Sequence, residues 1–104
     1  MEHIVVHDVG RDLAKKATVA AMDHYATKYG QYAPRTMWTG DYAADVGVRI
    51  KGISLDGKID VRDREIWMSL DIPFIFRPFR ARALAIIDRE IGSWIARAKA
   101  GEFN

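Results

Sequence analysis

Apolar and polar side chains alternate through most of the chain between residues 46 and 72. A period of two is typical of a β-strand with one buried and one solvated face, so the pattern predicts an antiparallel meander. Its inward positions fall in three stretches: Val46, Val48 and Ile50; then Ile53, Leu55, Gly57, Ile59 and Val61; then Ile66, Met68, Leu70 and Ile72.

Two turns must connect these three stretches. Residues 62–65, Arg-Asp-Arg-Glu, form one of them. The other lies either at Lys51-Gly52 or at Asp56-Gly57. The unbroken alternation from Ile53 to Val61 favours the turn at Lys51-Gly52.

A helical spacing of apolar residues predicts a helix over about residues 11–29. Its inward side is rich in alanine, so the helix can lie close to its neighbour. We expect Asp8 to cap its first turn and Gly30 to end it. Short strands are expected on either side, at residues 4–6 (Ile-Val-Val) and at residues 36–39 (Thr-Met-Trp-Thr).

Two prolines mark the transition from the meander to a second helix. Pro73 lacks a backbone N–H, so the last strand is expected to end near Ile72. Pro78 suits the first turn of a helix, which we predict over about residues 78–100. Its apolar stripe comprises Phe79, Ala83, Ile87, Ile91, Trp94, Ile95 and Ala98.

The elements together predict an α+β fold with two layers. An antiparallel meander sheet of four to five strands forms one layer. The N-terminal helix (about 11–29) and the long C-terminal helix (about 78–100) form the other, because both apolar stripes can be buried on one face of the sheet. The 104 residues fit a single domain, residues 1–104.

The amino-acid composition bears on the cellular location and the partners of the protein. The chain has no cysteine, which favours a reducing compartment. We expect neither a signal peptide nor a transmembrane segment, so the predicted location is the cytoplasm. The net charge of +2 is too small to indicate a nucleic-acid partner. Residues 77–104, with six Lys/Arg and three Asp/Glu, are the basic part of the chain.

The residue types that carry out catalysis form no recognisable constellation. His3 and His7 lie four positions apart on a predicted strand, about 13 Å, which is too far to share a metal ion. His7 is expected to bond a backbone group near the helix entry. No serine stands in a Gly-x-Ser-x-Gly motif, and no phosphate-binding loop is present. We therefore expect no enzymatic activity, no metal and no cofactor.

The segment Ile72–Arg80 holds several large apolar residues within a few positions. We expect it to plug the end of the sandwich. The alternative is a partly exposed apolar ridge with a basic rim, suited to an apolar surface, to a partner, or to the mouth of a lipid-sized cavity. The candidate binding residues are Phe74, Phe76, Arg77, Phe79 and Arg80.

Trp67 is an aromatic residue at a position that the alternation assigns to the polar face of the sheet. It either covers its neighbours or anchors a homodimer or another partner, because tryptophan is enriched at interface hot spots.

Several segments resemble those of one bacterial family. They are His7-Asp-Val-Gly10 before an alanine-rich helix, Trp38-Thr-Gly-Asp41, Asp56-Gly-Lys-Ile-Asp-Val61, and the apolar corner from Leu70 to Arg80 with its Arg-Pro pair. On these segments the chain resembles the polyhydroxyalkanoic acid system proteins, which are associated with polyester storage granules. Pro73 departs from the resemblance, because a glycine is expected at that corner.

The resemblance implies a non-catalytic role linked to the granule and brings no catalytic residues with it. The first hypothesis is therefore a cytoplasmic protein that binds the polyester granule surface or a granule protein. One alternative is a carrier of a small apolar ligand, with a pocket of at least about 300 Å³ between the sheet and the long helix. Another is a homodimeric structural protein.

Overall fold

Five strands form one antiparallel sheet in the computed structural model, which describes residues 2–103. The strands are β1 (Glu2–Val6), β2 (Arg35–Trp38), β3 (Ala43–Ile50), β4 (Ile53–Val61) and β5 (Glu65–Asp71). They are arranged in the order β1-β5-β4-β3-β2, and each neighbouring pair is antiparallel. The first strand of the chain thus pairs with the last and forms one edge of the sheet.

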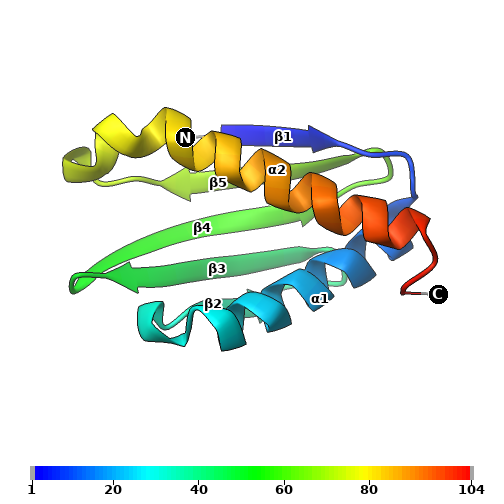
Figure 1. The fold of residues 1–104 in the computed structure, drawn as a ribbon, viewed down its shortest axis with the longest axis horizontal. Helices are drawn as coiled ribbons and strands as arrows, with labels where there is room; N and C mark the ends of the chain where they lie inside the picture. The colour runs from blue at the N-terminus through cyan, green and yellow to red at the C-terminus, as the bar shows by residue number, and fades with distance from the viewer. Residues whose placement is uncertain (1, 104) are drawn as a thin grey trace.

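Two helices, α1 (Arg11–Lys28) and α2 (Arg80–Lys99), lie on the same face of this sheet (Figure 1). Two short 3₁₀ helices, η1 (Gly30–Tyr32) and η2 (Phe74–Phe79), follow α1 and precede α2. The predicted two-layer α+β fold is therefore confirmed. In Figure 1, α1 and α2 approach each other near the C-terminal end of α2 and diverge toward η2.

The turn between β3 and β4 lies at Lys51-Gly52, as the alternation favours. Ile50 pairs with Ile53 across it, and both central residues have positive φ, 53° at Lys51 and 79° at Gly52. Two successive positive φ values are typical of a type I′ hairpin, whose twist matches that of the strands.

The ends of both helices differ from the prediction. Gly10 occupies the N-cap of α1, which has no side-chain cap, and the Asp8 carboxylate instead pairs with Lys99 Nζ at 2.7 Å. This hydrogen bond lowers the pKa of Asp8. Residues 74–79 form η2, so α2 begins at Arg80 rather than at Pro78.

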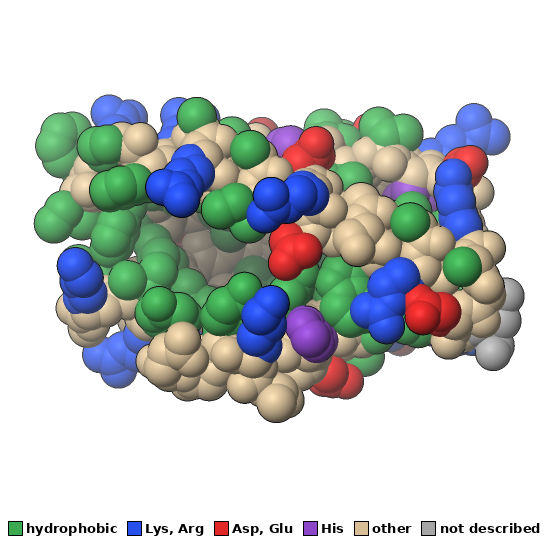
Figure 2. All heavy atoms as spheres, in the orientation of Figure 1, with side chains coloured by type: hydrophobic (Ala, Val, Ile, Leu, Met, Phe, Trp, Pro, Cys, Tyr) green, Lys and Arg blue, Asp and Glu red, His purple; other side chains and the backbone are tan. Residues whose placement is uncertain are grey.

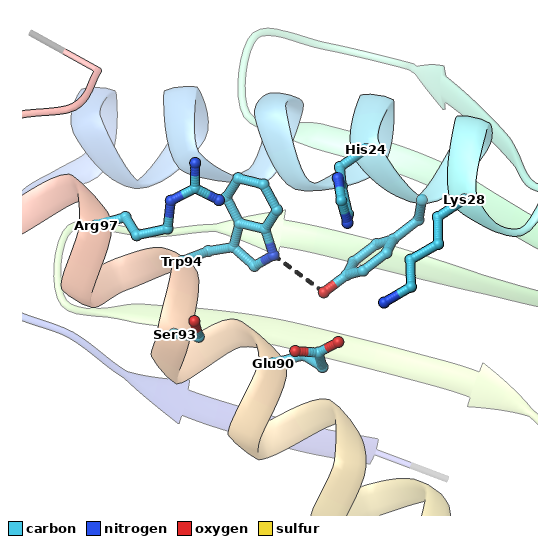
Figure 3. A pocket seen from close by; sticks show the side chains of 7 residues that line it. His24, Lys28, Glu90, Ser93, Trp94 and Arg97 are labelled. Carbon is cyan, nitrogen blue, oxygen red and sulfur yellow. Dashed lines mark hydrogen bonds between the residues drawn. The ribbon is translucent and has the colours of Figure 1, made fainter.

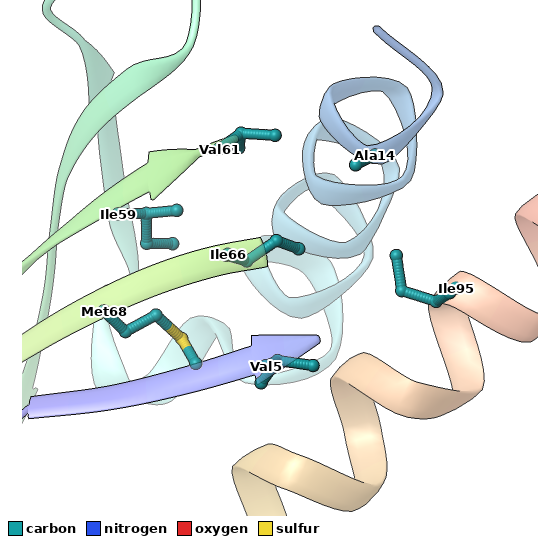
Figure 4. Close-up of a cluster of buried hydrophobic side chains, with 7 residues drawn as sticks. All are labelled: Val5, Ala14, Ile59, Val61, Ile66, Met68 and Ile95. Carbon is teal, nitrogen blue, oxygen red and sulfur yellow. The ribbon is translucent and has the colours of Figure 1, made fainter. Parts of the chain in front are cut away.

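The hydrophobic core lies where the two helices converge (Figure 4). Ala14 is fully buried, and its small side chain lets α1 come close to the sheet and α2. His7 is buried as well, with Nε2 at 2.9 Å from the carbonyl of Arg62, and Nδ1 accepts a bond from the Val9 N–H. The cluster comprises Val5, Ala14, Ile59, Val61, Ile66, Met68 and Ile95.

The other half of the apolar sheet face is not buried to the same degree. Val48, Ile50, Leu55 and Leu70 occupy predicted inward positions, yet each is only half-buried. Part of the face that the alternation predicts to be buried is therefore open. The helices diverge over these residues and leave part of the sheet open between them.

Candidate functional site

A deep groove runs between α1 and α2 over the open part of the sheet. Its volume is about 850 Å³, within the range of small-molecule sites. The floor includes Val46, Val48, Leu55 and Leu70 from the sheet, and the walls include Met22 and Ala26 from α1 and Ile87 and Ile91 from α2. Figure 2 shows the hollow ringed by hydrophobic side chains, with lysine and arginine side chains around its rim.

Gly57 shapes the floor of this groove. A Cβ at this position would lie 2.6 Å from Cδ2 of Leu70 and 2.6 Å from the carbonyl oxygen of Ser69. Glycine is therefore required here, since it leaves room for the Leu70 side chain on the paired strand. Leu70 can then lie low on the sheet instead of rising into the groove.

A smaller polar pocket adjoins the groove where the helices converge (Figure 3). Its volume is about 170 Å³. His24 and Lys28 are four positions apart on α1, and Glu90, Ser93 and Arg97 follow a helical spacing on α2, so each set faces the pocket from one side. The residues that line it are His24, Tyr25, Lys28, Glu90, Ser93, Trp94 and Arg97.

Two aromatic residues form the boundary between the pocket and the groove. The Trp94 indole N–H donates a hydrogen bond to the Tyr25 hydroxyl at 3.0 Å, drawn as the dashed line in Figure 3. Burial raises the pKa of Tyr25, the bond from Trp94 opposes this, and the carboxylate of Glu90 raises it further. The Tyr25 hydroxyl therefore stays protonated at neutral pH and keeps a hydrogen to donate.

The charges in the polar pocket are only partly paired. Arg97 lies over the Trp94 ring at 4.2 Å and bonds Glu102 through Nε at 2.6 Å. Lys28 Nζ lies 5.3 Å from the centre of the Tyr29 ring and has no carboxylate partner within residues 2–103.

The segment Ile72–Arg80 does not plug the sandwich. Phe74 is 82% exposed, Ile75 65% and Phe79 59%, whereas Ile72 and Phe76 are half-buried. We call Phe74, Ile75 and Phe79 the apolar ridge. In Figure 1, η2 lies at the end of the molecule where α1 and α2 are far apart, so the exposed ridge stands at the open end of the groove. Arg77 and Arg80 are exposed beside it, and the Arg77 guanidinium lies 5.8 Å from the centre of the Phe74 ring.

Trp67 lies on the opposite face of the sheet from the groove. Its pairing partner on β1 is Ile4, and the Arg62 guanidinium covers its ring at 4.2 Å. Its Nε1 is buried and finds no hydrogen-bond partner among residues 2–103. Trp67 is therefore not brought together with the ridge, and its role as a dimer anchor stays a prediction.

The groove lies where one alternative from the sequence placed a pocket, between the sheet and the long helix, and its volume of about 850 Å³ exceeds the expected minimum of about 300 Å³. The polar pocket beside it was not predicted. Alternation identifies which face of a strand is apolar, but not how much of that face a helix covers. A usable signal was present, since Glu90, Ser93 and Arg97 form a polar row beside the apolar stripe of α2. His24 and Lys28 form a matching row on α1.

Across residues 2–103, no group of three or more His, Asp or Glu side chains is placed to hold a metal ion. Over the same range, neither α1 nor α2 combines the length and apolar character needed to cross a bilayer.

A family model described as "Putative polyhydroxyalkanoic acid system protein" matches residues 4–94. The chain belongs to this family. The matched region extends from β1 to Trp94, so the polyhydroxyalkanoic acid system match contains the sheet floor and most of both walls of the groove. No curated protein and no solved structure matches the chain.

Proposed function

We propose that this protein is a non-catalytic binding protein of the polyhydroxyalkanoate system that holds an apolar acyl chain in the groove. The observation that carries the proposal is the groove itself, with a volume of about 850 Å³ and a floor of aliphatic side chains. A ligand that covers this floor gains about 25 cal/mol for each Å² of apolar surface removed from water.

Membership of the family suggests which class of ligand the groove binds. Polyhydroxyalkanoic acids are built from hydroxy acids that carry alkyl groups, and alkyl groups match the aliphatic lining of the groove. We place the protein in the cytoplasm as part of the same proposal.

A neutral apolar chain tests the groove directly. Titration of the protein with decanol, followed by calorimetry, should give saturable binding. Ala83 lines the groove, whereas Ala85, two positions away on α2, is exposed and does not. We expect Ala83→Trp to fill the groove and weaken decanol binding at least tenfold, and Ala85→Trp to leave it unchanged. Equal affinity of the two variants would reject the groove as the binding site.

A second candidate function is adsorption to the surface of the polyester granule. It is favoured by the exposure of the apolar ridge, 82% at Phe74, beside the cations Arg77 and Arg80. Large exposed apolar patches are rare on monomeric proteins and mark interaction sites. The ridge also adjoins the groove, since Phe79 precedes the groove residues Ala83 and Ile86 at helical spacing.

Partitioning onto polyester particles tests this second function. Phe74→Asp should reduce the bound fraction at least fivefold without unfolding the domain, because the side chain is already in water. Met37→Asp provides the control, since Met37 is 69% exposed on β2, away from the ridge. If Phe74→Asp and Met37→Asp partition equally, the ridge does not bind the granule.

A further inference from the structure

The groove and the polar pocket share part of their lining. Tyr25, Glu90 and Trp94 belong to both. A chain that lies along the groove therefore ends at the polar pocket, where the apolar lining gives way to charged and hydroxyl groups. A ligand that fills both spaces must be apolar along its length and polar at one end.

The length of the groove limits how long the apolar part of the ligand can be. Along α2, we measure it from Ala83 to Trp94, the groove residue that also lines the polar pocket. Eleven steps of 1.5 Å give a length of about 16 Å along the helix. With carbon–carbon bonds of about 1.5 Å, an extended chain of about ten carbons fits within this length.

The donors in the polar pocket favour an anionic end group. Lys28 is a cation without a carboxylate partner among residues 2–103, and Arg97 adds a second positive charge that Glu102 partly neutralises. The Tyr25 hydroxyl accepts a bond from Trp94 and interacts with the Glu90 carboxylate, so it is held at the junction of the groove and the pocket. A ligand carboxylate accepts bonds from the ammonium and guanidinium groups, and bonds with a charged partner are the strong ones.

Glu90 adds a second requirement for the ligand, a hydrogen-bond donor near its anionic end. Its carboxylate lies at the junction of the groove and the pocket, where it repels an anion and accepts hydrogen bonds. The ligand carboxylate is therefore favoured on the Lys28 side of the pocket. A hydroxyl on the chain next to the carboxylate could donate to Glu90.

We propose that the groove and the polar pocket together bind a free hydroxyalkanoic acid of about ten carbons, with the alkyl tail in the groove, the carboxylate at Lys28 and the hydroxyl at Glu90. The inference rests on the proposed binding function and specifies its ligand. This binding mode favours the monomer over the polyester. In the polyester the hydroxyl is esterified and has no hydrogen to donate to Glu90.

Calorimetry with four compounds tests the inference. We expect 3-hydroxydecanoate to bind most tightly, then decanoate, which lacks the hydroxyl, then decanol, which lacks the charge. We expect 3-hydroxybutyrate, which lacks the tail, to bind at least a hundredfold more weakly than 3-hydroxydecanoate. The ester-linked dimer of 3-hydroxydecanoate, whose hydroxyl next to the carboxylate is blocked, should bind no better than decanoate.

Two variants test which residues bind the polar end of the ligand. Lys28→Gln should weaken 3-hydroxydecanoate and decanoate about tenfold and leave decanol unchanged, and Lys16→Gln, at an exposed lysine of α1 outside both cavities, is the matched control. Glu90→Ala should bring the affinities of 3-hydroxydecanoate and decanoate together.

The outcomes separate this inference from the function on which it rests. If decanol binds as tightly as 3-hydroxydecanoate and Lys28→Gln changes nothing, the polar pocket is not a head-group site, and the groove function stands. If neither decanol nor 3-hydroxydecanoate binds, both are overturned.

Discussion

The Trp94 indole N–H and the Tyr25 hydroxyl form a hydrogen bond of 3.0 Å that ties α2 to α1 at the closed end of the groove. Trp94 is buried and Tyr25 half-buried, and their rings meet edge to face with centres 6.3 Å apart. This pair therefore holds the two walls at the point from which they diverge.

Removing this hydrogen bond should lower the free energy of unfolding. Tyr25→Phe keeps the ring and removes the acceptor, which leaves the Trp94 N–H unpaired, so we expect a loss of about 1–3 kcal/mol. Urea denaturation measures this loss. A double-mutant cycle with Trp94→Phe isolates the pair: the second change should cost less when the first is present. Strict additivity of the two changes would show that the bond contributes nothing.

Tyr25 should also make stability depend on alkaline pH. Its pKa is raised above the ordinary value of 10.0, chiefly by burial, so the folded state holds the phenolic proton more tightly than the unfolded state. This contribution is complete below pH 10.0 and is lost as the pH rises through the folded-state pKa.

Denaturation across this alkaline range measures the effect. Tyr25→Phe should show a shallower fall in stability than the wild type, and Tyr32→Phe, at an exposed tyrosine, should follow the wild type. The same slope in all three proteins would contradict the assignment to Tyr25.

Ala14 sets the distance between α1 and its neighbours. Its side chain is fully buried in the core of Figure 4. Ala14→Leu adds atoms where there is no space, and we expect it to destabilise the protein by about 1–3 kcal/mol. Ala96→Leu makes the same change at an exposed position of α2 and should have little effect. Thermal melting compares the two, and equal melting temperatures would show that the core has room at Ala14.

Two glycines of the sheet should differ in their tolerance of a methyl group. At Gly57, a Cβ would lie 2.6 Å from the backbone oxygen of Ser69, which cannot move alone. At Gly47, the nearest atoms are the ends of the Arg35 and Asp56 side chains, at 2.7 and 2.9 Å. Those ends can rotate away, with the loss of an exposed ion pair worth about 0–1 kcal/mol.

We therefore expect Gly57→Ala to cost about 1–3 kcal/mol and Gly47→Ala to cost less. Chemical denaturation of the two variants gives the comparison. A larger loss at Gly47 would mean that the Arg35–Asp56 pair is held more rigidly than its exposure implies.

Trp67 remains the candidate for a homodimer contact on the outer face of the sheet. Val6, 75% exposed, lies on this face near it. If two copies associate here, sedimentation should show a concentration-dependent dimer, and Trp67→Ala should shift it toward monomer because tryptophan anchors are common at interfaces. A dimer unaffected by this substitution would show that Trp67 does not contribute to the dimer contact.

Much of the fold could be predicted because it depends on local patterns. The alternation through residues 46–72 specifies three strands and their apolar face, and it places the tight turn at Lys51-Gly52. The prediction failed where a contact distant in sequence decides the structure. Asp8 pairs with Lys99, ninety-one positions away, instead of capping α1. The Phe74–Phe79 segment has the composition of a core plug, but it forms η2 and leaves Phe74, Ile75 and Phe79 exposed.

The elements, the apolar face of the sheet and the family could be predicted locally, because side-chain period and characteristic segments can be read along the chain. How much of that face stays open depends on contacts between parts of the chain that are distant in sequence. The angle between α1 and α2 depends on small side chains such as Ala14 and on the Trp94–Tyr25 bond, which join distant parts of the chain. That angle creates the groove, places the polar pocket at its closed end, and leaves the apolar ridge at its open end.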